Sequence, residues 1–144
     1  MTLLNKFIIF ILGLLIFSLS YGQSKDRWVF LPNSDFSYDK LSITKNNNTI
    51  KVWYQTVVDS DVKNQILSRK LMSKEIVDQI YTEKNGVILN CSNKTSAFFS
   101  VNLFNRNGIP VSQLSIPNNE LVFDSVSPDS NMENLLLFLC KKYK

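Results

Sequence analysis

The sequence predicts an α+β domain in which antiparallel strands are followed by a C-terminal helix that packs on them. Three observations support this prediction. Segments rich in β-branched and aromatic residues, separated by turns that contain Asn or Gly, occupy much of residues 27–114. An apolar stripe with helical spacing follows near the C-terminus. The chain has two cysteines, one in the strand-rich part and one in the stripe.

The N-terminal segment predicts export. Lys6 precedes an almost unbroken apolar run over residues 7–19, and the small residues Ser20 and Gly22 fit a signal-peptidase site. This run is shorter than the roughly 20 residues needed to cross a bilayer, so a membrane anchor is the less favoured interpretation. We expect residues 1–22 to be a signal peptide and residues 23–144 to be one exported domain without a membrane span. No cysteine lies near the junction, so lipid attachment is not expected.

Composition limits the classes of function. The formal net charge is +4, and the basic residues are scattered instead of clustered as in nucleic-acid-binding proteins, so no nucleic-acid partner is expected. The absence of histidine removes the usual general base and a common metal ligand. We therefore expect no enzymatic activity, no cofactor and no metal site. The acidic pairs Asp59/Asp61 and Asp35/Asp39 are better explained as turn residues.

The first elements predicted after the signal peptide are strands. Residues 27–31 form one strand, which ends at a turn containing Pro32. Residues 41–44 and 49–57 form a hairpin, because the Asn residues between them tolerate the left-handed conformation that a tight turn needs.

Residues 59–80 favour one or two short helices, because their apolar residues lie mostly three to five positions apart. Ser73 could cap the second helix. An irregular strand through Lys70 also fits this pattern. Asn85-Gly86 then predicts a turn. Three consecutive antiparallel strands follow, at residues 87–91, 96–104 and 109–114.

The C-terminal helix has the clearest pattern. Its stripe follows the spacing i, i+3, i+4, i+7 and i+8, at Met132, Leu135, Leu136, Leu139 and Cys140. Its start is specified twice, by Ser127 before Pro128 and by a capping box of Ser130 and Glu133.

The two cysteines are expected to face one sheet–helix interface. Cys140 lies on the helical stripe, and Cys91 alternates in phase with Val87 and Leu89. In an exported protein a Cys91–Cys140 disulfide is expected, with two free buried thiols as the alternative. Closing a loop of about 50 residues is worth roughly 4 kcal/mol in the chain-entropy model.

One face of the sheet is the candidate binding surface. Alternation places the residues that the helix would cover on one face, at Ile50, Val52, Tyr54, Val101 and Leu103. The opposite face then presents the candidate binding residues Lys51, Trp53, Gln55, Phe98 and Phe104. Aromatic rings among polar groups on an uncovered sheet are typical of interfaces, because large rings supply much of the contact energy. Alternatively, residues 59–80 or a curl of the sheet cover these rings as ordinary core.

Several short motifs occur in an order that is similar to the surface-adhesin protein E family of bacterial exported domains. They are Trp28, Tyr38-Asp39 before residues 41–43, Lys51-Val52-Trp53, Asn90-Cys91, Asn107-Gly108, residues 126–130 and Leu139-Cys140. The resemblance implies a single antiparallel sheet of about six strands with the C-terminal helix packed on one face. It also implies that the Cys91–Cys140 disulfide links the two.

The resemblance further implies a secreted or periplasmic, non-enzymatic, adhesin-like module that recognises a protein partner. The family's founding adhesin is an outer-membrane lipoprotein that can dimerise and that binds host matrix and plasma proteins. An extracellular-matrix or envelope protein and a homodimer are therefore the expected partners, with the protein in the periplasm, on the outer surface or outside the cell. The alternative function is a structural or assembly subunit of the cell envelope with no host ligand. A small-molecule carrier is a third hypothesis.

Overall fold

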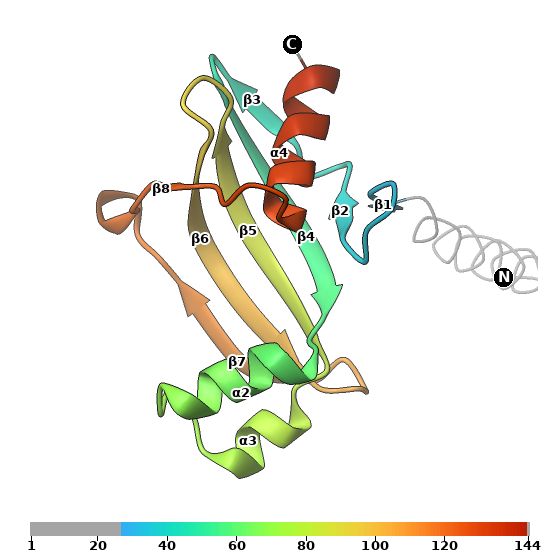
Figure 1. The fold of residues 1–144 in the computed structure, drawn as a ribbon, viewed down its shortest axis with the longest axis vertical. Helices are drawn as coiled ribbons and strands as arrows, with labels where there is room; N and C mark the ends of the chain where they lie inside the picture. Colours follow the sequence, from blue (N-terminus) through green and yellow to red (C-terminus); the bar gives the residue numbers. More distant parts are fainter. Residues whose placement is uncertain (1–26, 144) are drawn as a thin grey trace, which may run out of the picture.

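The computed structural model describes residues 27–143, and the predicted signal peptide at residues 1–22 lies outside them. The described residues form an antiparallel sheet with helices packed on it (Figure 1). This arrangement confirms the predicted α+β class, the antiparallel sheet and the C-terminal helix. The sheet has eight strands, where the sequence predicted about six.

The strands pair in the order β1-β2-β4-β5-β6-β7. The short strand β3 pairs with β4 on the same edge as β2, and β8 pairs with β6 on the same edge as β7. The strands span Trp28–Phe30 (β1), Ser37–Asp39 (β2), Thr44–Asn46 (β3), Thr49–Val57 (β4), Thr82–Asn90 (β5), Thr95–Phe104 (β6), Pro110–Ser115 (β7) and Asp124–Ser125 (β8). A short 3₁₀ helix, η1 (Asn118–Glu120), connects β7 to β8.

The predicted hairpin forms between β3 and β4, and Asn47 adopts the left-handed conformation expected of it, with φ 49°. The predicted turn at Asn85-Gly86 is wrong, because both residues lie inside β5. Gly86 pairs with Trp53 on β4 and Ser100 on β6. A Cβ atom at Gly86 would collide with the ring of Phe99, so the glycine serves close packing inside a strand instead of a turn.

Residues 59–80 form two short helices, α2 (Ser60–Ser68) and α3 (Lys74–Gln79). The side chain of Asp59 caps α2 by accepting a hydrogen bond from the Val62 amide at 2.9 Å. Lys70 follows α2 in a left-handed conformation, with φ 53°, which turns the chain toward α3. The two helices lie at one end of the sheet (Figure 1). Ile66 and Met72 of this segment pack on a small apolar cluster made of Val58, Ile80 and Leu103.

The C-terminal helix α4 (Asn131–Lys142) begins where its capping residues predict. The Ser130 hydroxyl accepts a hydrogen bond from the Glu133 amide at 3.1 Å, and the Glu133 carboxylate accepts one from the Asp129 amide at 2.8 Å. The helix therefore starts after Ser130 and not at Pro128. Its buried face carries Leu135, Leu136 and Leu139, which share one core cluster with Ile50, Val52, Tyr54, Val87 and Leu89 of the sheet.

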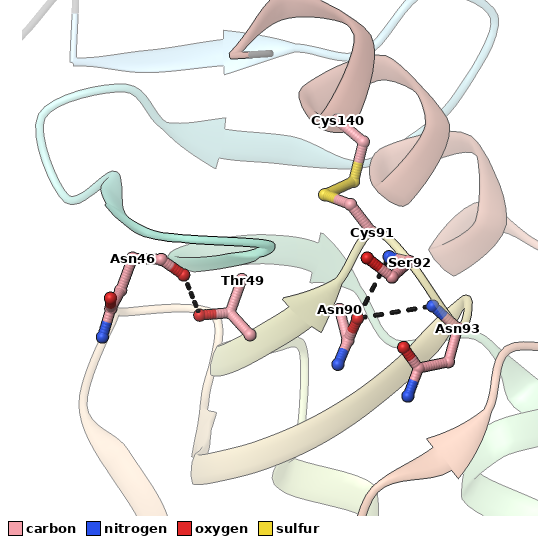
Figure 2. Close-up of a disulfide and its surroundings, with 7 residues drawn as sticks. All are labelled: Asn46, Thr49, Asn90, Cys91, Ser92, Asn93 and Cys140. Carbon is pink, nitrogen blue, oxygen red and sulfur yellow. Dashed lines mark hydrogen bonds between the residues drawn. A yellow bond between two sulfur atoms is a disulfide. The ribbon is translucent and has the colours of Figure 1, made fainter.

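The predicted disulfide is confirmed. Cys91 directly follows β5, Cys140 lies in the last turns of α4, and their Cα atoms are 5.7 Å apart (Figure 2). Beside it, the Asn90 side chain accepts hydrogen bonds from the amides of Ser92 and Asn93, at 3.0 and 3.4 Å. The bond therefore joins α4 to a turn that is itself held by local hydrogen bonds.

Candidate functional site

The two faces of the sheet differ in what covers them. Strand register places Tyr54 and Leu103 on the face on which α4, α2 and α3 pack, which we call the covered face. Lys51, Trp53 and Gln55 alternate to the other side, which we call the open face. None of the α-helices of residues 27–143 packs on the open face (Figure 1).

A β-bulge in β6 decides which phenylalanine reaches the open face. Gly86 pairs with Ser100 and Val87 pairs with Phe98, so Phe99 is an extra residue between them. The ring of Phe99 lies edge-on to Trp53, with centroids 5.3 Å apart, on the open face. Phe98 instead lies on the covered face, 6.5 Å from the ring of Tyr54. The prediction that Phe98 lies on the binding face is therefore wrong, because the bulge reverses the alternation on which it was based.

Two lysines lie against the open-face rings. The Lys51 Nζ atom is 4.1 Å from the Phe99 centroid. The Lys84 Nζ atom is 5.0 Å from the Phe104 centroid and 5.8 Å from that of Trp28. Such contacts attract an ammonium group to the negative face of a ring. Within residues 27–143 neither lysine forms a salt bridge, so both charges remain available to a ligand.

The remaining charged pair of this face is already neutralised. The Arg27 Nε atom donates to the Asp39 carboxylate at 2.7 Å, and this hydrogen bond raises the pKa of Arg27. Asp39 is buried and also accepts a hydrogen bond from the Leu41 amide at 3.0 Å. Asp39 is therefore held by partners inside the fold, and Lys51 and Lys84 give the surrounding surface a positive excess.

These residues line one hollow of about 770 Å³, which we call the open-face groove, that crosses the sheet from β1 to β7. Besides the paired Arg27, its aromatic and cationic lining comes from Trp28, Lys51, Trp53, Lys84, Phe99 and Phe104. Of the predicted binding residues, Lys51, Trp53 and Phe104 thus come together. Gln55 lies on the same face but lines a neighbouring hollow of about 320 Å³, which shares Lys84 and Phe104 with the groove.

Polar groups in the groove are fixed by hydrogen bonds. The Asn102 amide donates to the Lys84 carbonyl at 3.1 Å and to the Ser100 hydroxyl at 3.0 Å. Ser100 in turn donates to the Leu114 carbonyl at 3.1 Å, which ties β6 to β7. Because these groups satisfy one another, the groove keeps its shape without a ligand.

The sequence of the chain matches the model of the surface-adhesin protein E family over residues 28–141. The chain belongs to the surface-adhesin protein E family. This adhesin-family match includes both cysteines and, apart from Arg27, the residues of the groove lining named above. Comparison with curated proteins gives no significant match.

Solved structures similar to this surface-adhesin protein E family member include those of Haemophilus influenzae protein E. One has 14% sequence identity and a TM-score of 0.52, covering 84% of this chain and 89% of that one. A second crystal form has 15% identity and a TM-score of 0.53, covering 84% and 92%. Protein E from a non-typeable strain has 14% identity and a TM-score of 0.51, covering 85% and 80%. At these identities the likeness establishes the fold that the two proteins share.

Three groove residues of this adhesin-family protein were not predicted from the sequence. Phe99 was missed because a bulge leaves no mark in an apolar alternation, and Lys84 because the predicted turn at Asn85-Gly86 put it outside a strand. Trp28 was placed in a strand but not on a face. The signal that could have found Phe99 is the glycine itself, since aromatic rings often cover a glycine on a neighbouring strand.

The chemistry of the groove suits binding. Its charged and aromatic groups can attract anions and pack against apolar side chains. Within residues 27–143 no three acidic or cysteine side chains are grouped as a metal site. No helix in that range is long and apolar enough to span a membrane. Burial raises the pKa values of Tyr54 and Glu83, which lie on the covered face, away from the groove.

Proposed function

We propose that this family member is an exported, non-enzymatic, adhesin-like module that recognises a protein partner through its open face. The observation that carries the proposal is the open-face groove, which crosses six strands and on which no α-helix of residues 27–143 packs. A sheet face with two tryptophans and two phenylalanines normally gains stability from being covered. Here the described residues leave Trp28, Trp53 and Phe104 only partly buried, so a second molecule can complete the packing.

Physical features of the groove support protein recognition. Large rings supply contact area at low entropic cost, and interface hot spots are enriched in Trp. The polar groups between the rings are satisfied internally, so a ligand need not rearrange them. Binding to a surface of fixed shape avoids part of the ordering cost of association.

Export is the second part of the proposal. We infer that residues 1–22 are removed and that residues 23–144 work in the periplasm, on the outer surface or outside the cell. The Cys91–Cys140 disulfide supports this, because such bonds persist in oxidising compartments. Intact-mass analysis of the protein recovered from cells tests it. A mass that retains residues 1–22, or a mass that shows two free thiols, would contradict this part.

Site-specific photo-crosslinking in the producing cells tests the binding face. A benzophenone amino acid replaces Gln55 on the open face or, as the control, Leu137, which is 47% exposed on α4. We expect a covalent adduct with another protein from position 55 and none from position 137. Adducts only between copies of this chain would support a homodimer and contradict a separate partner.

Protease treatment of intact cells then separates the two candidate roles. An adhesin on the outer surface is degraded, whereas a subunit of the envelope interior is protected. A protected protein that still forms the adduct from position 55 would establish the envelope-assembly role and remove the adhesin role.

A further inference from the structure

The two free ammonium groups of the open-face groove lie at opposite ends of an aromatic floor. Lys51 is on β4, and Lys84 on β5 pairs with Gln55, four residues farther along β4. Four residues of strand span about 13 Å, and neighbouring strands are about 5 Å apart. Trp53 and its edge-on neighbour Phe99 lie between the two lysines in this register.

Neither ammonium group must leave an ion pair before it can bind a ligand. Each contacts rings instead of carboxylates, in contrast to Lys74 on α3, which is paired with Asp78 at 2.8 Å. The acidic residue that lines the groove, Asp39, is already bound to Arg27. The groove is thus complementary to a ligand with two separated negative charges and an apolar group between them.

An extended peptide has this spacing. Its alternate side chains point to one side, so residues i, i+2 and i+4 face the same surface, and the distance from i to i+4 is about 13 Å. We propose that the open-face groove binds an extended acidic peptide segment of the partner, with carboxylates at i and i+4 and an apolar side chain at i+2. The carboxylates bind Lys51 and Lys84, and the apolar side chain packs on Trp53 and Phe99. This inference rests on the proposed function, because it assigns the chemistry of the same binding face.

Fluorescence anisotropy with labelled synthetic peptides tests the spacing on the purified exported protein. The first peptide, TETFTET, places two Glu side chains four residues apart with Phe between them. Its isomer TETFETT has the same composition and charge but directs the second Glu to the opposite side, and TQTFTQT has no carboxylate side chains. We expect TETFTET to bind about tenfold more tightly than either of the others, and its binding to weaken as salt is added.

Three lysine variants test the position. K51Q and K84Q each remove one proposed contact and should weaken TETFTET binding several-fold, while K141Q, on the exposed end of α4, should leave it unchanged. Circular dichroism and an intact disulfide confirm that each variant is folded.

Three results would overturn the inference. They are equal binding of the two isomers, binding that is unaffected by K51Q and K84Q, and tighter binding of a heparin octasaccharide that depends on the same lysines. The last would identify the groove as a site for anionic glycans. If such a result occurs while position 55 still yields a protein adduct, only the ligand chemistry is wrong. If the adduct is also missing, the proposed function itself fails.

Discussion

The two faces of the sheet are built from alternate residues of the same strands, yet they differ in almost every property. On the covered face Val52 and Val87 are completely buried under α4, together with Leu139 of that helix. On the open face Trp53 and Lys51 line a hollow on which none of the α-helices in the described part of the chain packs. Under the proposed function, stability and recognition lie on opposite sides of one layer. Substitutions on one side should therefore leave the property of the other side largely intact.

The largest expected effect comes from removing the covalent link of the covered face. Replacing Cys91 and Cys140 together by Ser should lower the free energy of unfolding by about 4 kcal/mol. The two cysteines are 49 residues apart, and without the bond between them the unfolded chain gains conformational entropy. Chemical denaturation measures this loss, and the wild-type protein in reductant should show a similar one. An unchanged denaturation midpoint in both experiments would mean that packing alone holds α4 on the sheet.

A pair of neighbouring leucines on α4 separates packing from helix formation. Leu136 is 1% exposed against the sheet, whereas Leu137 is 47% exposed on the outer side of the same helix. L136A should destabilise the protein by about 2–5 kcal/mol through lost burial and the cavity it leaves. L137A should change stability by less than about 0.5 kcal/mol. Equal effects of the two substitutions in thermal denaturation would contradict the assignment of the covered face.

On the open face Gly86 is a position where a substitution should affect stability. A methyl group there would occupy the space of the Phe99 ring, which is itself fixed by Trp53 and Lys51. We expect G86A to cost about 1–3 kcal/mol, as overpacking does elsewhere. In the double variant G86A/F99A the ring is absent, so the cost of the added methyl should largely disappear. Additive effects in this double-mutant cycle would show that the ring does not cover the glycine.

The sequence predicted those features that depend on neighbouring residues. The position of α4 followed from its apolar stripe and from the capping box of Ser130 and Glu133. Capping is a local interaction, and the Ser130 hydroxyl does accept a hydrogen bond from the Glu133 amide. The faces of β4 followed from simple alternation, since Ile50 and Val52 are buried and Lys51 is exposed. The disulfide pairing followed from composition, as the chain has only two cysteines.

Features that depend on the pairing of distant strands could not be predicted. At the bulge, β6 has one extra residue, Phe99, between the partners of Gly86 and Val87 on β5. No local sequence pattern records this difference between the two strands. The three-residue strand β2 is buried at every position, so it shows no alternation. Of the residues predicted for the open face, Lys51, Trp53 and Phe104 line the groove and Phe98 lies on the covered face, while their role in binding stays a prediction.

The smallest expected effect concerns a polar site within the covered face. Glu83 lies beside Tyr54 and Asn85 on that side of the sheet, and burial, with a smaller contribution from the negative charge of Asp59, raises the pKa of Glu83. The folded state therefore holds the proton more tightly than the unfolded chain. The stability gained from this is complete below the ordinary Glu pKa and is lost as the pH rises through the raised value.

E83Q imitates the protonated group and should be more stable than the wild type near neutral pH. The difference should vanish near pH 4, roughly the ordinary Glu pKa, and below it. E75Q on α3 is the matched control, and its expected effect on stability has the opposite sign. Hydrogen bonds with its own backbone amide and Ser73 lower the pKa of Glu75, so E75Q should be slightly less stable near neutral pH and equal to the wild type in acid. Thermal midpoints measured between acid and neutral pH test both expectations. Parallel curves for E83Q and the wild type would mean that Glu83 is solvated and that the covered face is open to water there.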